Sequence, residues 1–418
     1  MLDGLEKAGV ESVAALAEAP GVRECLQWFS RERNWISEQH ARVVRIGAPT
    51  FFEQARAEWM ATQFRTLGCE VRTDGAGNLI ALPSKMPDPR RVVVSAHLDT
   101  VLAPRSPEEI IREPDGTLRG PGVADNGAGL AALLALAGAI HAAPALGDLQ
   151  CGVLLLANVC EEGEGNLSGM RHFSEDSRMG AEARAFLVLD GPATDYITCE
   201  ALESRRFEIT FSGPGGHSWH DFGVGNPVHA LCRALARFLE RYLEIKSATG
   251  ARSSFNFGRI EGGTSVNSIP SSARAKVDLR SEDGRMVEEL SALLAASMEK
   301  GAEVENARAS SGQVTARIRM IGSRPGGRLA EDAPILNFLH AVDSHLGITS
   351  RPERASTDAN IPLSKGLQAV SIGAGGQGGG AHTASEWFHP RDRALGLERI
   401  FLTLVLLMRT AGLAWGRG

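Results

Sequence analysis

The sequence predicts an α/β fold with a mostly parallel sheet, helices on both faces, and a smaller inserted α+β domain. Long apolar runs separated by helical segments are typical of buried parallel strands, and several occur in the first half of the chain. From Arg206 the order β-α-β-β-α-β indicates a split βαβ or ferredoxin-like unit. Because 418 residues exceed one ordinary core, we expect a discontinuous domain of residues 1–205 and 324–418 and an inserted domain of residues 206–323.

The composition is that of a soluble globular protein, with 43% hydrophobic and 22% charged residues. The formal net charge of −6 gives no reason to expect a nucleic acid or an anionic membrane as a partner. The cysteines form no C-x-x-C pair, and we expect Cys151, Cys160 and Cys199 to be reduced core residues. Because the chain shows no signal-like start and no run of 18 apolar residues, we expect a cytoplasmic protein.

The expected elements follow the hydrophobic periodicity in chain order. In the first part we expect helices at 22–46, 52–67 and 130–140, and strands at 78–82, from Arg91, at 151–159 and at 185–189. In the inserted domain we expect strands at 207–211, 254–260, 273–279 and 315–321, and helices at 226–242 and 282–298. The first domain then resumes with helices at 333–346 and 360–365, a strand at 369–372 and a helix from Arg393.

Polar side chains follow three of the apolar strands. The strand from Arg91 ends in His97-x-Asp99, the next ends in Glu161-Glu162, and the third in Asp190. Because ligand sites of open α/β sheets lie at the carboxyl ends of the strands, these side chains are expected to share one edge. One histidine at a strand end is more often structural than a metal ligand, but acidic ends on neighbouring strands favour a metal site.

Two further residues are expected at the same edge. Asp125 stands at the start of the helix at 130–140, where an N-cap is the simpler interpretation, but four nearby glycines indicate a more crowded environment. His382 lies in a glycine-rich tract that follows the strand at 369–372, so the tract is interpreted as a site loop.

These motifs resemble those of the co-catalytic zinc exopeptidases, a family that includes tripeptidase T, carboxypeptidase G and the aminoacylases. The matching segments are 95–101, 122–129, 161–163, 189–191 and 380–383. The inserted domain, with its segment 213–218, resembles the family's lid. The resemblance is closest to the tripeptidase T-like branch, because carboxypeptidase-like members often have glutamate where this chain has Asp190.

The resemblance implies two Zn²⁺ ions per subunit, with Co²⁺ or Mn²⁺ as alternatives. His97 and Asp190 would hold one ion, Glu162 and His382 the other, and Asp125 would bridge them. Each ion then has three protein ligands, which leaves an open position for a water molecule. Two Zn²⁺ bring four positive charges against three carboxylates, and the surplus charge favours a bridging hydroxide as the nucleophile.

The resemblance also assigns roles to residues that bind no metal. Glu161 would be the general base, and Asp99 would be the partner that fixes the ring of His97. On that assignment Asp99→Ala weakens activity more than it weakens folding. His217 would reach a developing oxyanion, in relatives from the neighbouring subunit.

Asn267 and Arg280 resemble a substrate-gripping pair, since a guanidinium fork fits a terminal carboxylate. A surface cation at a strand end remains the alternative for Arg280, and a structural role remains the alternative for His217. Where relatives often have lysine after the bridging aspartate, this chain has Asn126. The remaining histidines receive no functional role: His40, His141, His172, His220, His229, His340, His345 and His389.

The function expected from these motifs is hydrolysis of the amide bond of di- and tripeptides by a zinc exopeptidase. One alternative is removal of the acyl group from N-acyl amino acids by the same metal centre. A second is a non-catalytic metal-binding relative, which the presence of Glu161 argues against. The resemblance further implies a homodimer formed through the inserted lid domain.

Overall fold

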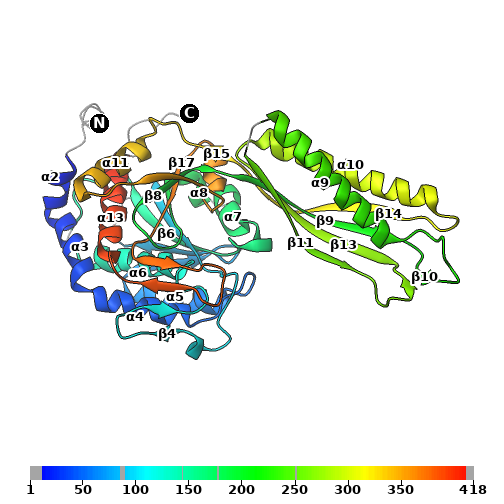
Figure 1. Cartoon of the computed structure of the whole chain (residues 1–418). Coiled ribbons are helices and arrows are strands. Elements are labelled where there is room, and N and C mark those ends of the chain that lie inside the picture. The colour runs from blue at the N-terminus through cyan, green and yellow to red at the C-terminus, as the bar shows by residue number, and fades with distance from the viewer. Residues whose placement is uncertain (1–11, 85–89, 144, 177, 250–251, 411–418) are drawn as a thin grey trace. The chain divides into compact units, whose positions relative to one another are not determined.

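The computed structural model describes residues 12–84, 90–143, 145–176, 178–249 and 252–410. The described residues form two compact units (Figure 1). The first contains residues from 1–201 and 327–418, and the second residues 202–326. Each unit has its own hydrophobic core.

The first unit is built on a nine-stranded sheet. Its strands are β1 (Cys69–Thr73), β2 (Leu79–Pro83), β3 (Arg91–His97), β6 (Gly152–Asn158), β7 (Ala183–Leu189), β8 (Tyr196–Ala201), β15 (Gly327–Arg328), β16 (Arg351–Ala355) and β17 (Gln368–Ile372). The order is β1-β2-β6-β3-β7-β17-β8-β15, and β16 also pairs with β8. The central strands β6, β3, β7 and β17 are parallel, whereas β2 is antiparallel to β6 and β8 to β17. The predicted fold class is confirmed.

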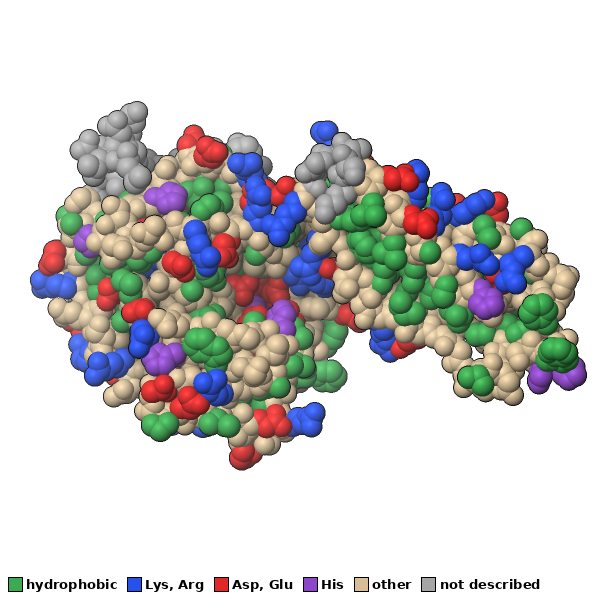
Figure 2. All heavy atoms as spheres, viewed as in Figure 1, with side chains coloured by type: hydrophobic (Ala, Val, Ile, Leu, Met, Phe, Trp, Pro, Cys, Tyr) green, Lys and Arg blue, Asp and Glu red, His purple; other side chains and the backbone are tan. Residues whose placement is uncertain are grey.

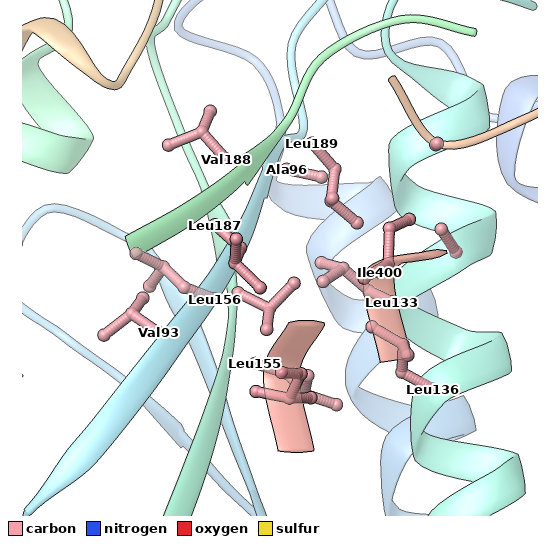
Figure 3. Close-up of a cluster of buried hydrophobic side chains, with 14 of the residues drawn as sticks. Val93, Ala96, Leu133, Leu136, Leu155, Leu156, Leu187, Val188, Leu189 and Ile400 are labelled. Atoms are coloured by element: carbon pink, nitrogen blue, oxygen red, sulfur yellow. The ribbon is translucent and has the colours of Figure 1, made fainter. Parts of the chain in front are cut away.

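The central strands are apolar throughout because helices cover both faces of the sheet. All residues of β3 and β6 are buried. On one face, a Cβ built on Gly129 of α6 would lie 3.0 Å from the Cβ of Ala96. On the other face, Phe186 pairs in register with Val93 and its ring lies 6.4 Å from that of Phe173 in α7. Figure 3 shows the leucine- and valine-rich packing between the sheet and its helices.

The helices of the first unit match most of the expected segments. They are α2 (Val13–Glu18), α3 (Pro20–Arg31), α4 (Arg33–Val44), α5 (Gln54–Thr66), α6 (Gly127–Ala142), α7 (Ser168–Asp176), α8 (Arg178–Glu182), α11 (Pro334–Leu346), α12 (Asn360–Ser364) and α13 (Arg393–Thr410). The expected helix at 22–46 is in fact two helices, which Glu32 separates. Every residue from Gly127 to Ile140 of α6 is buried, as its alanine, glycine and leucine content allows.

A small sheet brings two distant segments together beside the main sheet. Its strands are β4 (Ile111–Arg112), β5 (Leu118–Arg119), β18 (Gln377–Gly379) and β19 (Trp387–His389), in the order β18-β19-β5-β4. The pairing of β19 with β5 sets residues 380–386 against the turn that precedes α6. The described residues also form two short 3₁₀ helices, Pro107–Glu109 and Gly163–Gly165.

The second unit has the ferredoxin-like order of elements. Its long elements are β9 (Glu203–Ser212), α9 (Pro227–Thr249), β11 (Ser253–Gly262), β13 (Ser272–Ser281), α10 (Gly284–Arg308) and β14 (Thr315–Arg324). The antiparallel sheet has the order β11-β13-β9-β14. A short pair, β10 (Gly216–His217) with β12 (Ser268–Ile269), joins two loops of this unit.

The cysteines and the helices bear on two other expectations. All six cysteines are free; Cys151 and Cys160 are buried and Cys199 is half-buried. Among the helices of the described residues, none combines the length and the apolar character that crossing a membrane requires.

Candidate metal centre

The polar strand ends predicted from the sequence meet at one edge of the main sheet. His97 is the last residue of β3, Glu161 and Glu162 follow β6, and Asp190 follows β7. These three strands are parallel neighbours, so their carboxyl ends lie together. Figure 2 shows acidic side chains beside a histidine in a recess on one face of the first unit.

Asn126, rather than Asp125, caps helix α6. The side-chain oxygen of Asn126 accepts a hydrogen bond from the main-chain nitrogen of Gly129 at 3.1 Å. The Asn126 side chain also donates to the carbonyl of Leu189 at 2.8 Å and accepts from the nitrogen of Gly191 at 3.3 Å. It therefore holds both neighbours of Asp190 and leaves the carboxylate of Asp125 available for other contacts. The peptide bond between Asp125 and Asn126 is cis.

The carboxylate of Asp125 lies between two histidines. Its Oδ1 is 3.1 Å from Nε2 of His97, and its Oδ2 is 3.1 Å from Nε2 of His382. His97 Nε2 is also 3.8 Å from Oδ1 of Asp190, and His382 Nε2 is 3.0 Å from Oε1 of Glu162. The structure thus brings together all five residues that the sequence predicted as ligands.

This donor set fits two divalent cations that share one carboxylate. Ligand atoms about 2.0 to 2.1 Å from a tetrahedral Zn²⁺ lie roughly 3.3 Å from one another. The contacts made by the two histidines, 3.0 to 3.8 Å, bracket that separation. The ligand atoms of His97, Asp125 and Glu162 all lie within 4.8 Å of one another. Imidazole nitrogens with carboxylate oxygens are also the donors found in catalytic zinc sites.

The carboxylates around the two histidines favour their protonated forms in the metal-free chain. Hydrogen bonds that His382 donates to the carboxylates of Asp125 and Glu162 raise its pKa to about 10. Burial opposes charge on His97, but hydrogen bonds with Asp125, Asp190 and Asp99 raise its pKa well above the ordinary value. Burial likewise opposes ionisation of Asp125, but the two histidines lower its pKa. A cation that binds here therefore replaces protons.

The ring of His97 contacts both the main-chain carbonyl and the carboxylate of Asp99. Nδ1 of His97 donates to the carbonyl oxygen of Asp99 at 2.9 Å, whereas the Asp99 carboxylate lies 3.5 Å away. Because a carbonyl only accepts, Nδ1 carries a proton. In the metal-free chain Nε2 carries a second proton, directed at Asp125, and a cation that binds would take the place of this Nε2 proton. The orienting group is therefore mainly the peptide oxygen of Asp99.

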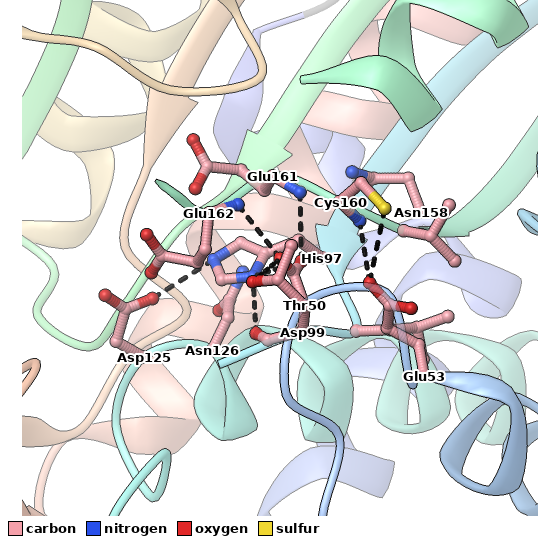
Figure 4. A network of polar contacts seen from close by, with 12 residues as sticks. Thr50, Glu53, His97, Asp99, Asp125, Asn126, Asn158, Cys160, Glu161 and Glu162 are labelled. Carbon is pink, nitrogen blue, oxygen red and sulfur yellow. Dashed lines mark hydrogen bonds and ion pairs between the residues drawn. The ribbon is translucent and has the colours of Figure 1, made fainter. Parts of the chain in front are cut away.

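The carboxylate of Asp99 instead holds the loop after β6 (Figure 4). Its two oxygens accept hydrogen bonds from the main-chain nitrogens of Glu161 at 3.0 Å and Glu162 at 2.9 Å. The hydroxyl of Thr50 donates to the same carboxylate at 2.9 Å. Burial opposes ionisation of Asp99, but the contact with His97 and these N–H groups lower its pKa. The side chain of Glu161 is buried and points away from Asp99.

The predicted residues of the second unit lie in two places. His217 is exposed, and its Nδ1 accepts hydrogen bonds from the nitrogens of Trp219 and His220. Its loop contacts that of Asn267, whose carbonyl accepts a bond from the nitrogen of Ser218 at 3.0 Å. The structure therefore brings His217 and Asn267 together.

Arg280 is remote from that loop pair within the second unit. It lies near the end of β13 that pairs with Ser204, eight residues and roughly 27 Å along the strand from Ser272. Its Nε donates to the carboxylate of Asp278. The second unit by itself does not join Arg280 to Asn267.

Three buried residues near the centre were not predicted from the sequence. Glu386 and His40 contact the turn before α6. Asp358 is fully buried and accepts a hydrogen bond from the side chain of Asn158 at 2.6 Å. Burial raises the pKa of Asp358 to about 7. The position of Glu386, four residues after His382, was the only signal in the sequence, and His40 looked like an ordinary helical residue.

Comparison with known proteins finds a similar family for a segment of each unit. Residues 78–199 match the model of peptidase family M28, and residues 203–306 match that of the peptidase dimerisation domain. The two matched segments are thus similar to a peptidase domain and to a peptidase dimerisation domain. These matches confirm the resemblance to peptidases that the motifs indicated. A protein of Ajellomyces dermatitidis named "Probable carboxypeptidase" is 28% identical over 227 residues, 51% of this chain and 50% of that protein. The chain thus spans about half the length of the curated relatives it matches.

Solved structures share the fold over nearly the whole chain. A tripeptidase from Staphylococcus aureus superposes with a TM-score of 0.70 at 18% identity, covering 90% of this chain and 98% of that one. The di-peptidase Dug1p from Saccharomyces cerevisiae gives 0.71 at 13% identity, with coverages of 94% and 99%. An amidase of the hydantoinase/carbamoylase family from Burkholderia vietnamiensis gives 0.67 at 15% identity, with coverages of 90% and 97%.

Proposed function

We propose that this protein is a zinc-dependent exopeptidase that hydrolyses the amide bond of di- and tripeptides. The observation that carries the proposal is the carboxylate of Asp125, whose two oxygens face His97 and His382 at 3.1 Å each. One carboxylate between two such histidines suits a pair of cations that share a ligand.

In this proposal His97 and Asp190 hold one Zn²⁺, Glu162 and His382 hold the other, and Asp125 is common to both. Bound cations of this kind lower the pKa of water to about 7 and polarise a carbonyl oxygen. Glu161 accepts the proton of the attacking water and passes it to the departing amine.

Residues of the second unit complete the proposed site. His217 stabilises the developing oxyanion, and Asn267 and Arg280 bind the terminal carboxylate of the peptide. His217 is exposed, and its loop contacts the loop of Asn267. Both features suit residues that reach a substrate bound in the neighbouring subunit. We further propose a homodimer formed through this unit, which the match to a peptidase dimerisation domain supports.

The second candidate is hydrolysis of an N-acyl amino acid by the same centre. The fold similarity to an amidase of the hydantoinase/carbamoylase family suits this candidate, because an amidase also cleaves an amide bond. Both candidates use the same metal ligands and the same base, so they differ only in what the rest of the site recognises.

The test is a substrate panel on protein stripped of metal and reloaded separately with Zn²⁺, Co²⁺ or Mn²⁺. Release of free amino acids from di- and tripeptides, with blocked peptides left intact, supports the exopeptidase. Acetate from N-acetyl amino acids, with peptides left intact, supports the second candidate. If no metal restores hydrolysis of either class and the purified protein holds only traces of metal, the proposed centre is wrong.

A further inference from the structure

The turn that precedes α6 is anchored by a buried carboxylate from a distant part of the chain. Glu386 is only 2% exposed and lies between β18 and β19, in the same loop as His382. Its Oε2 accepts a hydrogen bond from the main-chain nitrogen of Gly122 at 2.9 Å. Its Oε1 accepts two more, from Ala124 at 2.6 Å and from Asp125 at 2.8 Å. Both oxygens of Glu386 are thus occupied by main-chain N–H groups.

The carbonyl side of the same turn is held by a second buried side chain. Nε2 of His40 lies 2.7 Å from the carbonyl oxygen of Val123, and Nδ1 of His40 contacts the guanidinium of Arg393. Because arginine can only donate, Nδ1 of His40 accepts a hydrogen bond from Arg393. Nε2 therefore carries the proton and donates a hydrogen bond to the carbonyl oxygen of Val123. The turn therefore has fixed partners for both its N–H and its C=O groups.

We propose that Glu386 is a positioning residue of the metal centre. It fixes the backbone of Asp125 and ties it to the loop that carries His382, so that two ligands of one cation keep their separation. The inference rests on the proposed function, because it assigns Asp125 and His382 to a cation site. Glu386 itself would touch neither metal nor substrate.

The proposal differs from a purely structural role in what it predicts for metal affinity. Charge-assisted hydrogen bonds from three N–H groups stabilise the turn in either case. Only a positioning role makes Co²⁺ binding by the folded protein depend on Glu386. Loss of a side chain that orients metal ligands lowers metal affinity about 10- to 100-fold.

The test measures Co²⁺ binding by metal-free wild type, Glu386→Gln and Glu386→Ala, from visible absorption in competition with a chelating indicator. Both variants are expected to bind Co²⁺ about 10- to 100-fold more weakly, the alanine variant more so. Glutamine keeps one acceptor oxygen but sets an NH₂ group against a main-chain N–H. The matched control is Glu305→Gln in the second unit, since Glu305 is 1% exposed and accepts the nitrogen of Asn226 at 3.1 Å.

The control is expected to bind Co²⁺ within about twofold of wild type, because Glu305 belongs to the other unit and shares no partner with the ligands. The melting temperatures of all metal-free proteins are compared first. The Co²⁺ affinities are then measured at a temperature well below the lowest of these melting temperatures. Wild-type affinity in a folded Glu386→Ala, or in Glu386→Gln should the alanine variant not fold, overturns the proposal. Equal weakening in Glu305→Gln also overturns it. If the wild type itself binds no Co²⁺, the proposed function fails first, before any variant is compared.

Discussion

The carboxylate of Asp99 accepts a hydrogen bond from the main-chain nitrogen of Glu162 at 2.9 Å, and this contact ties the end of β3 to the loop after β6. The neighbouring nitrogen of Glu161 donates to the other carboxylate oxygen at 3.0 Å. One buried side chain therefore positions both the proposed base and a proposed ligand. Its role is wider than orienting one imidazole ring.

Asp99→Ala is expected to weaken folding as well as metal binding. The change leaves two buried main-chain N–H groups without an acceptor, which costs about 1 to 3 kcal/mol for each group. We expect the free energy of unfolding of the metal-free protein to fall by roughly 3 kcal/mol in urea titrations. The control Thr50→Val removes one bond to the same carboxylate and should cost only about 1 kcal/mol. An unchanged stability of Asp99→Ala would contradict the role seen here.

Glu161→Gln is expected to abolish most turnover without loss of metal. Glutamine keeps the shape of the side chain but cannot accept the proton of the attacking water, and a general base contributes about 10²- to 10⁴-fold to rate. Steady-state kinetics and metal analysis on one preparation check this. Glu164→Gln, an exposed residue of the same loop, should behave as wild type. Full turnover of metal-loaded Glu161→Gln would refute the proposed mechanism.

Asn126→Ala is expected to destabilise the first unit more than an ordinary loss of a helix cap. Removing an N-cap costs about 1 kcal/mol, and the bond to the buried carbonyl of Leu189 adds about 1 kcal/mol more. Asp283→Ala is a matched control, because Asp283 caps α10 through the nitrogen of Arg285 alone. Urea unfolding should separate the two by about 1 kcal/mol. Of the two variants, only Asn126→Ala should also weaken Co²⁺ binding. If Asn126→Ala and Asp283→Ala had the same effect on stability and on Co²⁺ binding, the Asn126 side chain would not position Asp190.

Asp358 is expected to make the metal-free protein less stable as pH rises towards neutrality. Burial raises its pKa to about 7, against about 3.9 in an unfolded chain. Between these values the folded protein holds a proton that the unfolded chain has released, so the free energy of unfolding falls with rising pH.

Asp358→Asn removes that titration. From pH 5 to pH 8 the variant should lose about 2 to 3 kcal/mol less stability than wild type, measured by urea unfolding with a chelator present. Asp332→Asn, an exposed carboxyl of the same unit, should keep the wild-type pH dependence. The same pH dependence in Asp358→Asn and wild type would show that Asp358 is ionised in the folded chain.

His217 is expected to serve the active site of the partner subunit. His217→Ala should lower kcat with metal content unchanged. The ring of His220 lies 4.8 Å from that of His217, and the control His220→Ala should keep the wild-type kcat. Co-expressed Glu161→Gln and His217→Ala chains should then recover about a quarter of wild-type activity, since half of randomly paired dimers hold one complete site. A mixture no more active than the single variants would show that His217 does not act across subunits.

Local patterns predicted the fold class well because strands that are buried on both faces of a sheet appear in the sequence as continuous apolar runs. The runs before His97, Glu161 and Asp190 became the parallel neighbours β3, β6 and β7. Short or partly exposed elements have a weaker hydrophobic pattern, and β1, β8 and α7 were not predicted. The periodicity also predicted one helix where Glu32 separates two. Hydrophobic periodicity says little about such segments.

The sequence by itself determined which strand ends are polar, and so which residues could meet at one sheet edge. Only the tertiary structure decided how they are held. Glu386 accepts the nitrogen of Ala124 across 262 positions of sequence, and the Asp99 carboxylate, 3.5 Å from the ring of His97, instead accepts the nitrogens of Glu161 and Glu162. Hydrogen bonds between distant segments depend on where the chain returns after folding, and no local spacing or periodicity records that.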